Sequence, residues 1–270
     1  MITAMDVEEY LSYLESYTKD GKLYTNREEG KARKLSSLKS FYDYYFKKNL
    51  IRTNPPRQVD VPKIKNKNII RLDPNEIAQL LDEAESGEKL SGRQLASHEK
   101  TKVRDVAILT LLLGTGIRVS ECVGLNLEDV DFNNGAIRII RKGGNEALIY
   151  FGDEVSQALE AYMNGPRKTA EPAAGHEEAL FISLNKTRIT TRSVERLVKK
   201  YSRLVTTVKK ITPHKLRSTF GTALYQETGD IYLVADTLGH KDVNTTKKHY
   251  AAIDEHRRRM AANVVKLRES

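Results

Sequence analysis

The stretch VAILTLLLGTGIRVSE, residues 106–121, determines how the rest of the chain is organised. Its first eight residues carry no charge and are nearly all apolar, which predicts a buried helix at the centre of a core. Gly114 and Gly116 end this run, and the charged residues Arg118 and Glu121 follow within five positions. A charged pair at the edge of a core is either a structural ion pair or a ligand for an anion such as phosphate.

Several common kinds of site are missing from the sequence. The Gly-x-Gly at 114–116 lacks the third glycine, the preceding strand and the downstream acid of a dinucleotide site. The histidines show no HExxH pattern, and the G-x-S-x-G of a serine hydrolase does not occur. Cys122 is the single cysteine, which excludes an internal disulfide and a cysteine-based metal cage. We therefore expect no metal, no cofactor and no small-molecule substrate.

The charge of the chain favours a polyanionic partner. Its 270 residues include 45 Lys and Arg against 36 Asp and Glu, a net charge of +9. Just over half of this excess lies in residues 1–68, and basic chains of this kind often bind nucleic acid. No apolar run reaches the roughly eighteen residues of a membrane helix, and no signal peptide opens the chain. We expect a cytoplasmic protein with no membrane partner.

The N-terminal quarter reads as a small helical unit followed by a linker. Hydrophobic spacing predicts helices over 5–19 and 27–48, and the aromatic residues late in the second helix should pack a small core. Residues 61–71 contain Pro62, Lys63, Lys65 and Lys67, a composition that is solvated and unsuited to a helix. This segment predicts a boundary between a unit at 1–60 and a larger one at 72–270.

The larger unit reads as mainly helical with one small antiparallel sheet. Two short β-prone runs, 136–142 and 146–151, flank a Gly-Gly-Asn turn typical of a hairpin. Residues 86–101 are polar and read as a loop. The predicted helices cover 74–85, 101–113, 153–163, 191–206, 213–228, 230–238, 244–252 and 254–266.

Four separate positions in this unit have side chains that could carry chemistry. In TPHKLRSTF, residues 212–220, His214 and Arg217 share one face at the start of a helix, where free N–H groups already favour negative charge. Lys142 ends a strand, His240 follows a helix, and Tyr250 lies on the next helix. Taken singly, each has an ordinary structural explanation: a solvated lysine, a turn histidine or a half-buried tyrosine.

Taken together and in order, these residues resemble the tyrosine recombinases, the phage integrase family. The matching stretches are TGIRVSE (115–121), RKGGNEALIYF (141–151), TPHKLRSTF (212–220) and LGHKDVNTTKKHY (238–250). The resemblance is strong over 72–266. It is looser over 1–60, where LSSLKSFYDYYFKKNLIRTNP resembles the close of the family's helical core-binding domain.

The resemblance implies a two-domain DNA clamp. Residues 1–60 would be a core-binding, SAM-like helical domain lacking its opening helices, and 72–270 the tyrosine-recombinase catalytic domain. The activity implied is site-specific DNA recombination or integration: strands are cut and rejoined through a 3′-phosphotyrosyl intermediate and a Holliday junction, without metal or ATP. The substrate implied is double-stranded DNA with inverted-repeat sites, at a prokaryotic chromosome or mobile element, bound by a homotetramer joined through the C-terminal segment.

The resemblance also assigns roles to individual residues. Tyr250 would attack, Arg118 and Arg217 would hold the phosphate, and Lys142 would protonate the leaving oxygen. His214 and His240 complete the catalytic set, with Glu121 behind it. His249 is a second candidate, because ten positions separate His240 from Tyr250 where nine is usual. The basic residues expected to contact DNA are Arg27, Lys31, Arg33, Lys34, Lys63, Lys65, Lys67, Arg141 and Lys215.

Two alternatives remain open from the sequence. A type IB topoisomerase-like nicking and relaxing enzyme uses similar residues but needs no special site. A DNA-binding protein with a decayed catalytic pocket would need no chemistry, although the complete set of six catalytic residues argues against decay.

Overall fold

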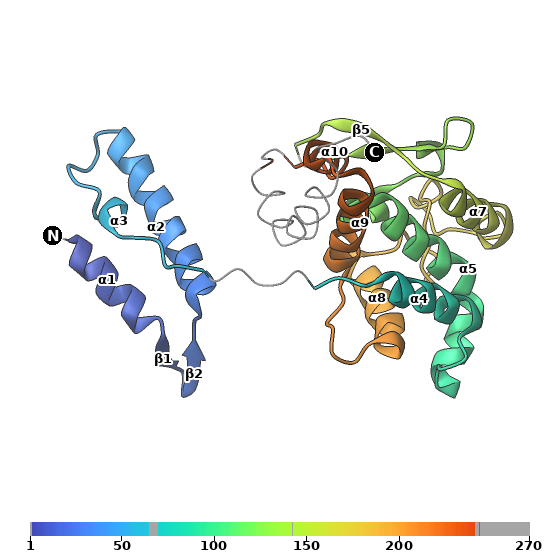
Figure 1. The fold of residues 1–270 in the computed structure, drawn as a ribbon, viewed down its shortest axis with the longest axis horizontal. Helices are drawn as coiled ribbons and strands as arrows, with labels where there is room; N and C mark the ends of the chain where they lie inside the picture. Colours follow the sequence, from blue (N-terminus) through green and yellow to red (C-terminus); the bar gives the residue numbers. More distant parts are fainter. Residues whose placement is uncertain (1, 65–69, 142, 241–242, 244–270) are drawn as a thin grey trace, which may run out of the picture. The chain divides into compact units, whose positions relative to one another are not determined.

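The computed structural model describes residues 2–64, 70–141, 143–240 and 243. The chain divides into two compact units, Met1–Lys67 and Asn68–Ser270 (Figure 1). Helices dominate both, and the strands form two small antiparallel sheets, which confirms the predicted fold class. Within the described ranges, no helix is both long enough and apolar enough to cross a membrane.

The first unit combines three helices with a β-hairpin. Its elements are α1 (Ala4–Tyr13), β1 (Ser16–Lys19), β2 (Lys22–Thr25), α2 (Glu28–Lys47) and α3 (Pro55–Gln58). The predicted helix over 5–19 is therefore wrong in its second half. Asp20 and Gly21 have φ values of 51° and 71°, the left-handed pair of a two-residue hairpin turn. The Asp-Gly dipeptide between β-prone residues was the signal for this hairpin.

The expectation that the late aromatic residues of α2 fill a core is also wrong. Phe41 is 57% exposed, Tyr44 54% and Phe46 39%. The small core instead uses the first half of α2 together with α1 and the residue after α3. Its buried members are Val7, Leu11, Leu14, Leu35 and Val59.

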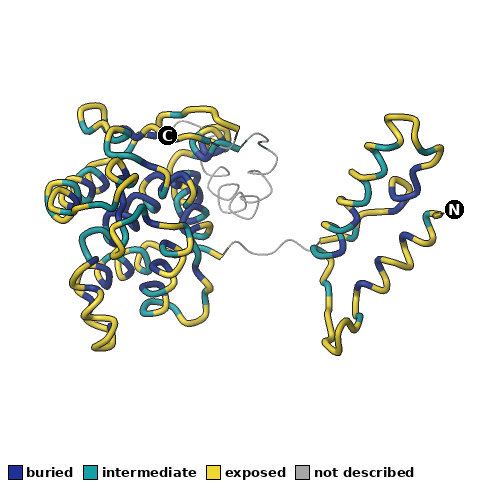
Figure 2. Tube along the Cα trace, turned by 180° about the vertical axis from the view of Figure 1, so that it is seen from behind, coloured by how far each residue is buried: buried dark blue, intermediate teal, exposed yellow. Residues whose placement is uncertain are grey.

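The second unit contains the main core. Its elements are α4 (Pro74–Ser86), α5 (Gly92–Thr115), α6 (Val119–Gly124), the 3-10 helix η1 (Leu127–Asp129), β3 (Val130–Asp131), β4 (Ala136–Ile140), β5 (Glu146–Tyr150), α7 (Asp153–Tyr162), the π-helical turn η2 (Met163–Arg167), α8 (Thr191–Val205), α9 (Pro213–Thr228) and α10 (Ile231–Thr237). In Figure 2 the buried residues concentrate in the interior of this unit. The helices predicted at 244–252 and 254–266 lie outside the described residues.

Helix α5 forms the centre of this core. Ala107, Ile108, Leu109 and Leu111 are fully buried, as the apolar run predicted. The helix begins nine residues earlier than expected, at Gly92, so the predicted loop over 86–101 is wrong. Ser91 caps the new start, because its backbone N–H donates to Gln94 Oε1 at 3.2 Å in a capping box.

The three-stranded sheet has the order β3-β4-β5, with both pairs antiparallel. The predicted hairpin is confirmed, with Ala136 opposite Tyr150 and Ile140 opposite Glu146. Ile137 and Ile139 are buried while Arg138 and Ile140 are exposed, so one face packs on the core and the other is solvated. The short third strand, β3, was not predicted.

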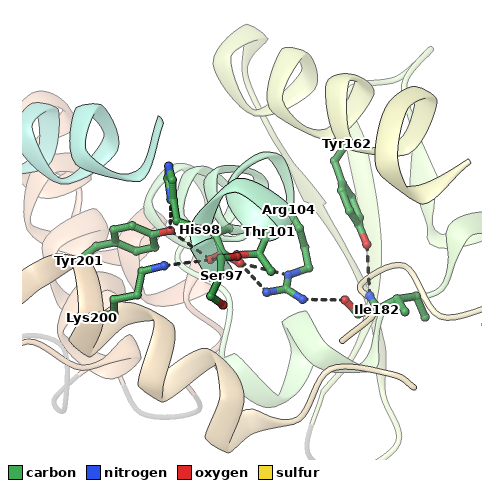
Figure 3. A network of polar contacts seen from close by, with 9 residues as sticks. Ser97, His98, Thr101, Arg104, Tyr162, Ile182, Lys200 and Tyr201 are labelled. Atoms are coloured by element: carbon green, nitrogen blue, oxygen red, sulfur yellow. Dashed lines mark hydrogen bonds and ion pairs between the residues drawn. The ribbon is translucent and has the colours of Figure 1, made fainter. Parts of the chain in front are cut away.

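A buried carboxylate joins α5 to α8 (Figure 3). Asp105 Oδ1 accepts from Arg104 Nη2 at 2.7 Å, and Oδ2 accepts from Thr101 Oγ1 at 3.0 Å and Tyr201 Oη at 3.1 Å. Tyr201 Oη also lies 3.0 Å from His98 Nδ1. Since the tyrosine donates its one proton to Asp105, His98 must donate from Nδ1. Every buried charge in this network therefore has a partner.

Removing the Tyr201 hydroxyl tests how much this network stabilises the second unit. Tyr201→Phe leaves Asp105 and His98 each short of one buried partner, so unfolding free energy should fall by about 1–3 kcal/mol. Urea denaturation measures the change. The same substitution at Tyr150, which is 70% exposed, is the control and should change little. Equal stability of both variants would contradict the assigned role.

The stability of the second unit should also fall in mild acid because of His98. Burial, and then the charge of Lys200, hold the pKa of His98 below its ordinary value. The unfolded chain therefore binds a proton at a higher pH than the folded one, so this stabilisation is complete above about pH 6.5 and is lost as pH falls further. Denaturation midpoints between pH 7.5 and 5 should drop more steeply for the wild type than for His98→Gln.

Candidate active site

Arg118 lies at the turn between α5 and α6, where its conformation is fixed by Glu121. The Glu121 carboxylate accepts from the Arg118 backbone N–H at 2.6 Å and from Nη1 at 2.8 Å. Glu121 is 7% exposed, whereas the Arg118 side chain is 38% exposed. The second guanidinium nitrogen, Nη2, reaches Gly239 O at 3.4 Å. One buried carboxylate thus orients a guanidinium that remains open to solvent.

Arg217, on α9, reaches the same turn. Its Nη1 donates to Gly116 O at 2.6 Å, and its Nη2 donates to Leu238 O. It is only 6% exposed. Since Leu238 and Gly239 are consecutive, the guanidinium groups of Arg118 and Arg217 bind adjacent carbonyls. Two arginines about a hundred residues apart in the sequence therefore converge on one turn.

A third arginine, Arg141 directly after β4, and His240 also lie at the turn after α10. Arg141 Nη2 donates to Thr237 O at 3.2 Å and contacts Asp236 O at 3.4 Å. Gly239 has a φ of 61°, and a Cβ there would collide with the Arg141 guanidinium. The His240 N–H donates to Ala235 O at 2.8 Å, which holds the half-buried histidine directly beyond this turn. The left-handed φ of Gly239 favours a glycine there, and a side chain would also displace the Arg141 guanidinium.

The electrostatics of this cluster favour an anion. Three guanidinium groups surround the turn, and Glu121 is the carboxylate hydrogen-bonded to one of them. The carbonyls that accept from the arginines carry only partial negative charge. A phosphate in the same place would accept charge-assisted, bidentate hydrogen bonds from planar guanidinium groups.

The remaining catalytic candidates are placed only in part. His214 is exposed in the first turn of α9, whereas Arg217, three residues later, is buried. The start of this helix at Pro213 is as predicted. Lys142, His249 and Tyr250 lie outside the described residues.

Cys122, in α6 next to Glu121, is completely buried, and burial raises the pKa of its thiol to about 12.

The predicted DNA-contacting residues differ in how accessible they are. Arg27, Arg33 and Lys63 are exposed, and Lys34 and Lys215 are half-buried. Lys31 is 7% exposed, with its ammonium 2.6 Å from Glu15 and 2.8 Å from Glu28. The structure therefore gives Lys31 a role in folding, and Arg141 a role in holding the turn after α10. Lys65 and Lys67 lie outside the described residues.

Sequence reasoning missed a basic stripe on α8. Arg192, Arg196, Lys199 and Arg203 are exposed, while Val194, Leu197, Val198 and Tyr201 face the core. The four cations follow the spacing i, i+4, i+7, i+11, which places them on one face of a helix. That spacing was readable in the sequence and predicts a surface able to follow a phosphate backbone.

In the part of the chain that the structure describes, no three or more His, Cys, Asp or Glu side chains are grouped so that they could hold a metal ion.

Comparison with known proteins places the chain in a family. The model of the phage integrase family matches residues 70–257. The tyrosine recombinase XerC of Thermodesulfovibrio yellowstonii is 37% identical over 218 residues, 80% of this chain and 69% of the relative. The tyrosine recombinase XerD of Oceanobacillus iheyensis is 29% identical and is matched over 83% of its length.

Solved structures have the same fold. The XerH recombinase bound to palindromic difH in a post-cleavage complex superposes with a TM-score of 0.74 at 21% identity, covering 97% of this chain and 72% of that one. The Tn1549 transposon integrase in complex with circular intermediate DNA gives 0.70 at 24% identity, covering 96% of this chain and 85% of the other. On the extent of the family match and the XerC identity, this chain belongs to the phage integrase family, the tyrosine recombinases.

Proposed function

We propose that the chain is a site-specific DNA recombinase in which Arg118 and Arg217 hold the scissile phosphate while Tyr250 attacks it. The observation that carries this proposal is the convergence of the two guanidinium groups on the adjacent carbonyls of Leu238 and Gly239. These two residues directly precede His240, and Tyr250 follows Gly239 by eleven positions in the sequence.

The reaction exchanges one phosphate ester for another. The Tyr250 oxygen forms a bond to phosphorus while the bond from phosphorus to the 5′ oxygen breaks, leaving a 3′-phosphotyrosyl link. The tyrosine proton passes to a base, for which His214 is our candidate, and Lys142 gives a proton to the departing 5′ oxygen. Because the new ester keeps the bond energy, a 5′ hydroxyl of a partner strand can reverse the step without ATP.

The arginines supply the charge that this transition state needs. Negative charge builds on the non-bridging oxygens, and Arg118 and Arg217 can donate to them bidentately. Glu121 positions Arg118 through two short hydrogen bonds, so the guanidinium needs little reorganisation when DNA binds. A tyrosine hydroxyl has an ordinary pKa of about 10, and nearby cations lower the cost of forming the phenolate.

The proposal extends to the DNA and to the assembly. Exposed cations on both units, among them Arg27, Arg33 and the α8 stripe, support a clamp on double-stranded DNA. Recombination needs four strand exchanges in pairs, so we propose a homotetramer on inverted-repeat sites that passes through a Holliday junction. Its place would be the cytoplasm, where prokaryotic chromosomal and mobile-element DNA lie.

Loss of the nucleophile should abolish covalent capture of DNA. Wild-type protein mixed with fragmented DNA and quenched in denaturing detergent should retain covalently attached fragments, and Tyr250→Phe should retain none because no phosphotyrosine can form. Sequencing the retained fragments should reveal one palindrome-like site. Capture without sequence preference would indicate a topoisomerase-like enzyme instead. Capture that survives Tyr250→Phe would overturn the assignment.

Loss of a phosphate-holding arginine should affect cleavage far more than DNA affinity. Arg118→Ala should slow covalent capture by about a hundredfold or more while changing duplex affinity less than tenfold. Arg138→Ala is a matched control, since Arg138 is similarly exposed, at 44%, and also paired with carboxylates. The control should keep near wild-type capture. Equal loss in both variants would remove Arg118 from the phosphate site.

A further inference from the structure

The β1–β2 hairpin of the first unit is joined to the small core through Tyr17, which packs against it. Of residues 16–25, all are exposed except Tyr17, which is half-buried. The hairpin extends past the ends of α1 and α2 in both views (Figures 1 and 2). A two-stranded ribbon with so little packing is marginally stable in water, which favours a partner for its exposed surface.

One face of this hairpin carries aromatic rings and two cations. Tyr17 pairs with Tyr24 and Lys19 with Lys22 across the strands, so these four side chains share a face. The rings of Tyr17 and Tyr24 stack at 5.4 Å, and Tyr13 at the end of α1 continues the stack at 5.2 Å from Tyr17. We name this surface, formed by Tyr13, Tyr17, Lys19, Lys22 and Tyr24, the ribbon face.

The two lysines indicate the chemistry of the partner. Like charges directly opposite in an antiparallel pair destabilise it, and no described residue forms an ion pair with Lys19 or Lys22. Asp20 is the single acidic residue among residues 16–25. A polyanion placed against the tip relieves this repulsion, whereas an apolar or cationic partner does not.

The dimensions and the position of the hairpin favour duplex DNA. Four residues a strand extend about 13 Å, and the two strands lie about 4.8 Å apart. A ribbon of this size fits the major groove, which is about 12 Å wide and admits a two-stranded β-ribbon. Directly after β2 come the exposed Arg27, at the N-terminus of α2, and Arg33 in its second turn. The hairpin therefore directly precedes, in the sequence, two cations already proposed to contact DNA.

We propose that the β1–β2 hairpin is a DNA-contacting ribbon, with Lys19 and Lys22 on phosphates and the stacked tyrosines against the groove. The inference rests on the proposed function in needing duplex DNA as substrate, but it assigns a contact that the catalytic chemistry does not require. It predicts that the first unit holds DNA through the hairpin as well as through the start of α2.

The salt dependence of DNA binding tests the two lysines. The logarithm of DNA affinity falls linearly with the logarithm of salt concentration, and each phosphate contact makes this slope steeper by about 0.9. The variant Lys19→Ala/Lys22→Ala in the full chain should therefore have a slope that is shallower by about two. The control is Lys47→Ala/Lys48→Ala, which removes the same charge about 30 Å away at the other end of the 20-residue helix α2. The control should leave the slope near the wild-type value.

A fluorescent reporter tests whether the tyrosines of the ribbon face contact DNA. The chain has no tryptophan, so Tyr24→Trp gives a signal from the hairpin alone. Acrylamide quenching of this variant should fall when a duplex is added, and quenching of Phe46→Trp, at the far end of α2, should not. Protection that appears with rising protein concentration in the absence of DNA would mean a protein contact and would overturn the proposal.

The outcomes separate this inference from the proposed function. If wild-type protein captures DNA covalently but the hairpin double variant keeps the wild-type salt slope, the hairpin proposal alone fails. An equal loss of slope in the hairpin and control variants also overturns it, because only net charge would then matter. If the wild type neither binds duplex nor captures it, both proposals fall together.

Discussion

The site depends on the close packing of Phe220 and Leu238 against Gly116. Gly116 follows the last residue of α5 and has a left-handed φ of 63°. A Cβ at this position would overlap Phe220 of α9 and lie 3.0 Å from Leu238 after α10. The Gly116 carbonyl accepts from Arg217 at 2.6 Å. One residue without a side chain thus lets α5, α9 and the turn after α10 meet. The spacing between Arg118 and Arg217 follows from that contact.

Helix α5 connects Gly116 to the core of the second unit. Most of its apolar half is buried, and its polar half is tied to α8 by Asp105 and Tyr201. Sequence-distant bonds of this kind fix a helix along its length and around its axis. The site at its C-terminal end therefore rests on a rigid element, which suits catalysis that depends on preorganised charge. The first unit has a much smaller core.

Sequence patterns predicted the parts of this molecule that are governed by local rules. The apolar run before Gly114, the proline-initiated helices at Pro74 and Pro213, and the β4–β5 hairpin were all readable from spacing and turn chemistry. The errors came from signals that were given too little weight. Asp20-Gly21 specified a hairpin inside a predicted helix, and Ser91 with Gln94 specified a helix start inside a predicted loop.

The contacts of the site were less predictable, because they depend on tertiary packing. The Arg118–Glu121 pair was readable, since three residues separate its members. Nothing in the sequence indicated that Arg141 would bind the carbonyls after α10, or that Lys31 would be buried between two glutamates.

The burial of Cys122 gives the chain a useful chemical property. Thiol reagents attack the thiolate, and a fully buried thiol with a pKa of about 12 forms almost none while the protein is folded. Since α6 also carries Glu121, modification of Cys122 would report the opening of the very helix that positions Arg118. With no competing thiol elsewhere in the sequence, a cysteine introduced on the surface can be labelled selectively in an otherwise native enzyme.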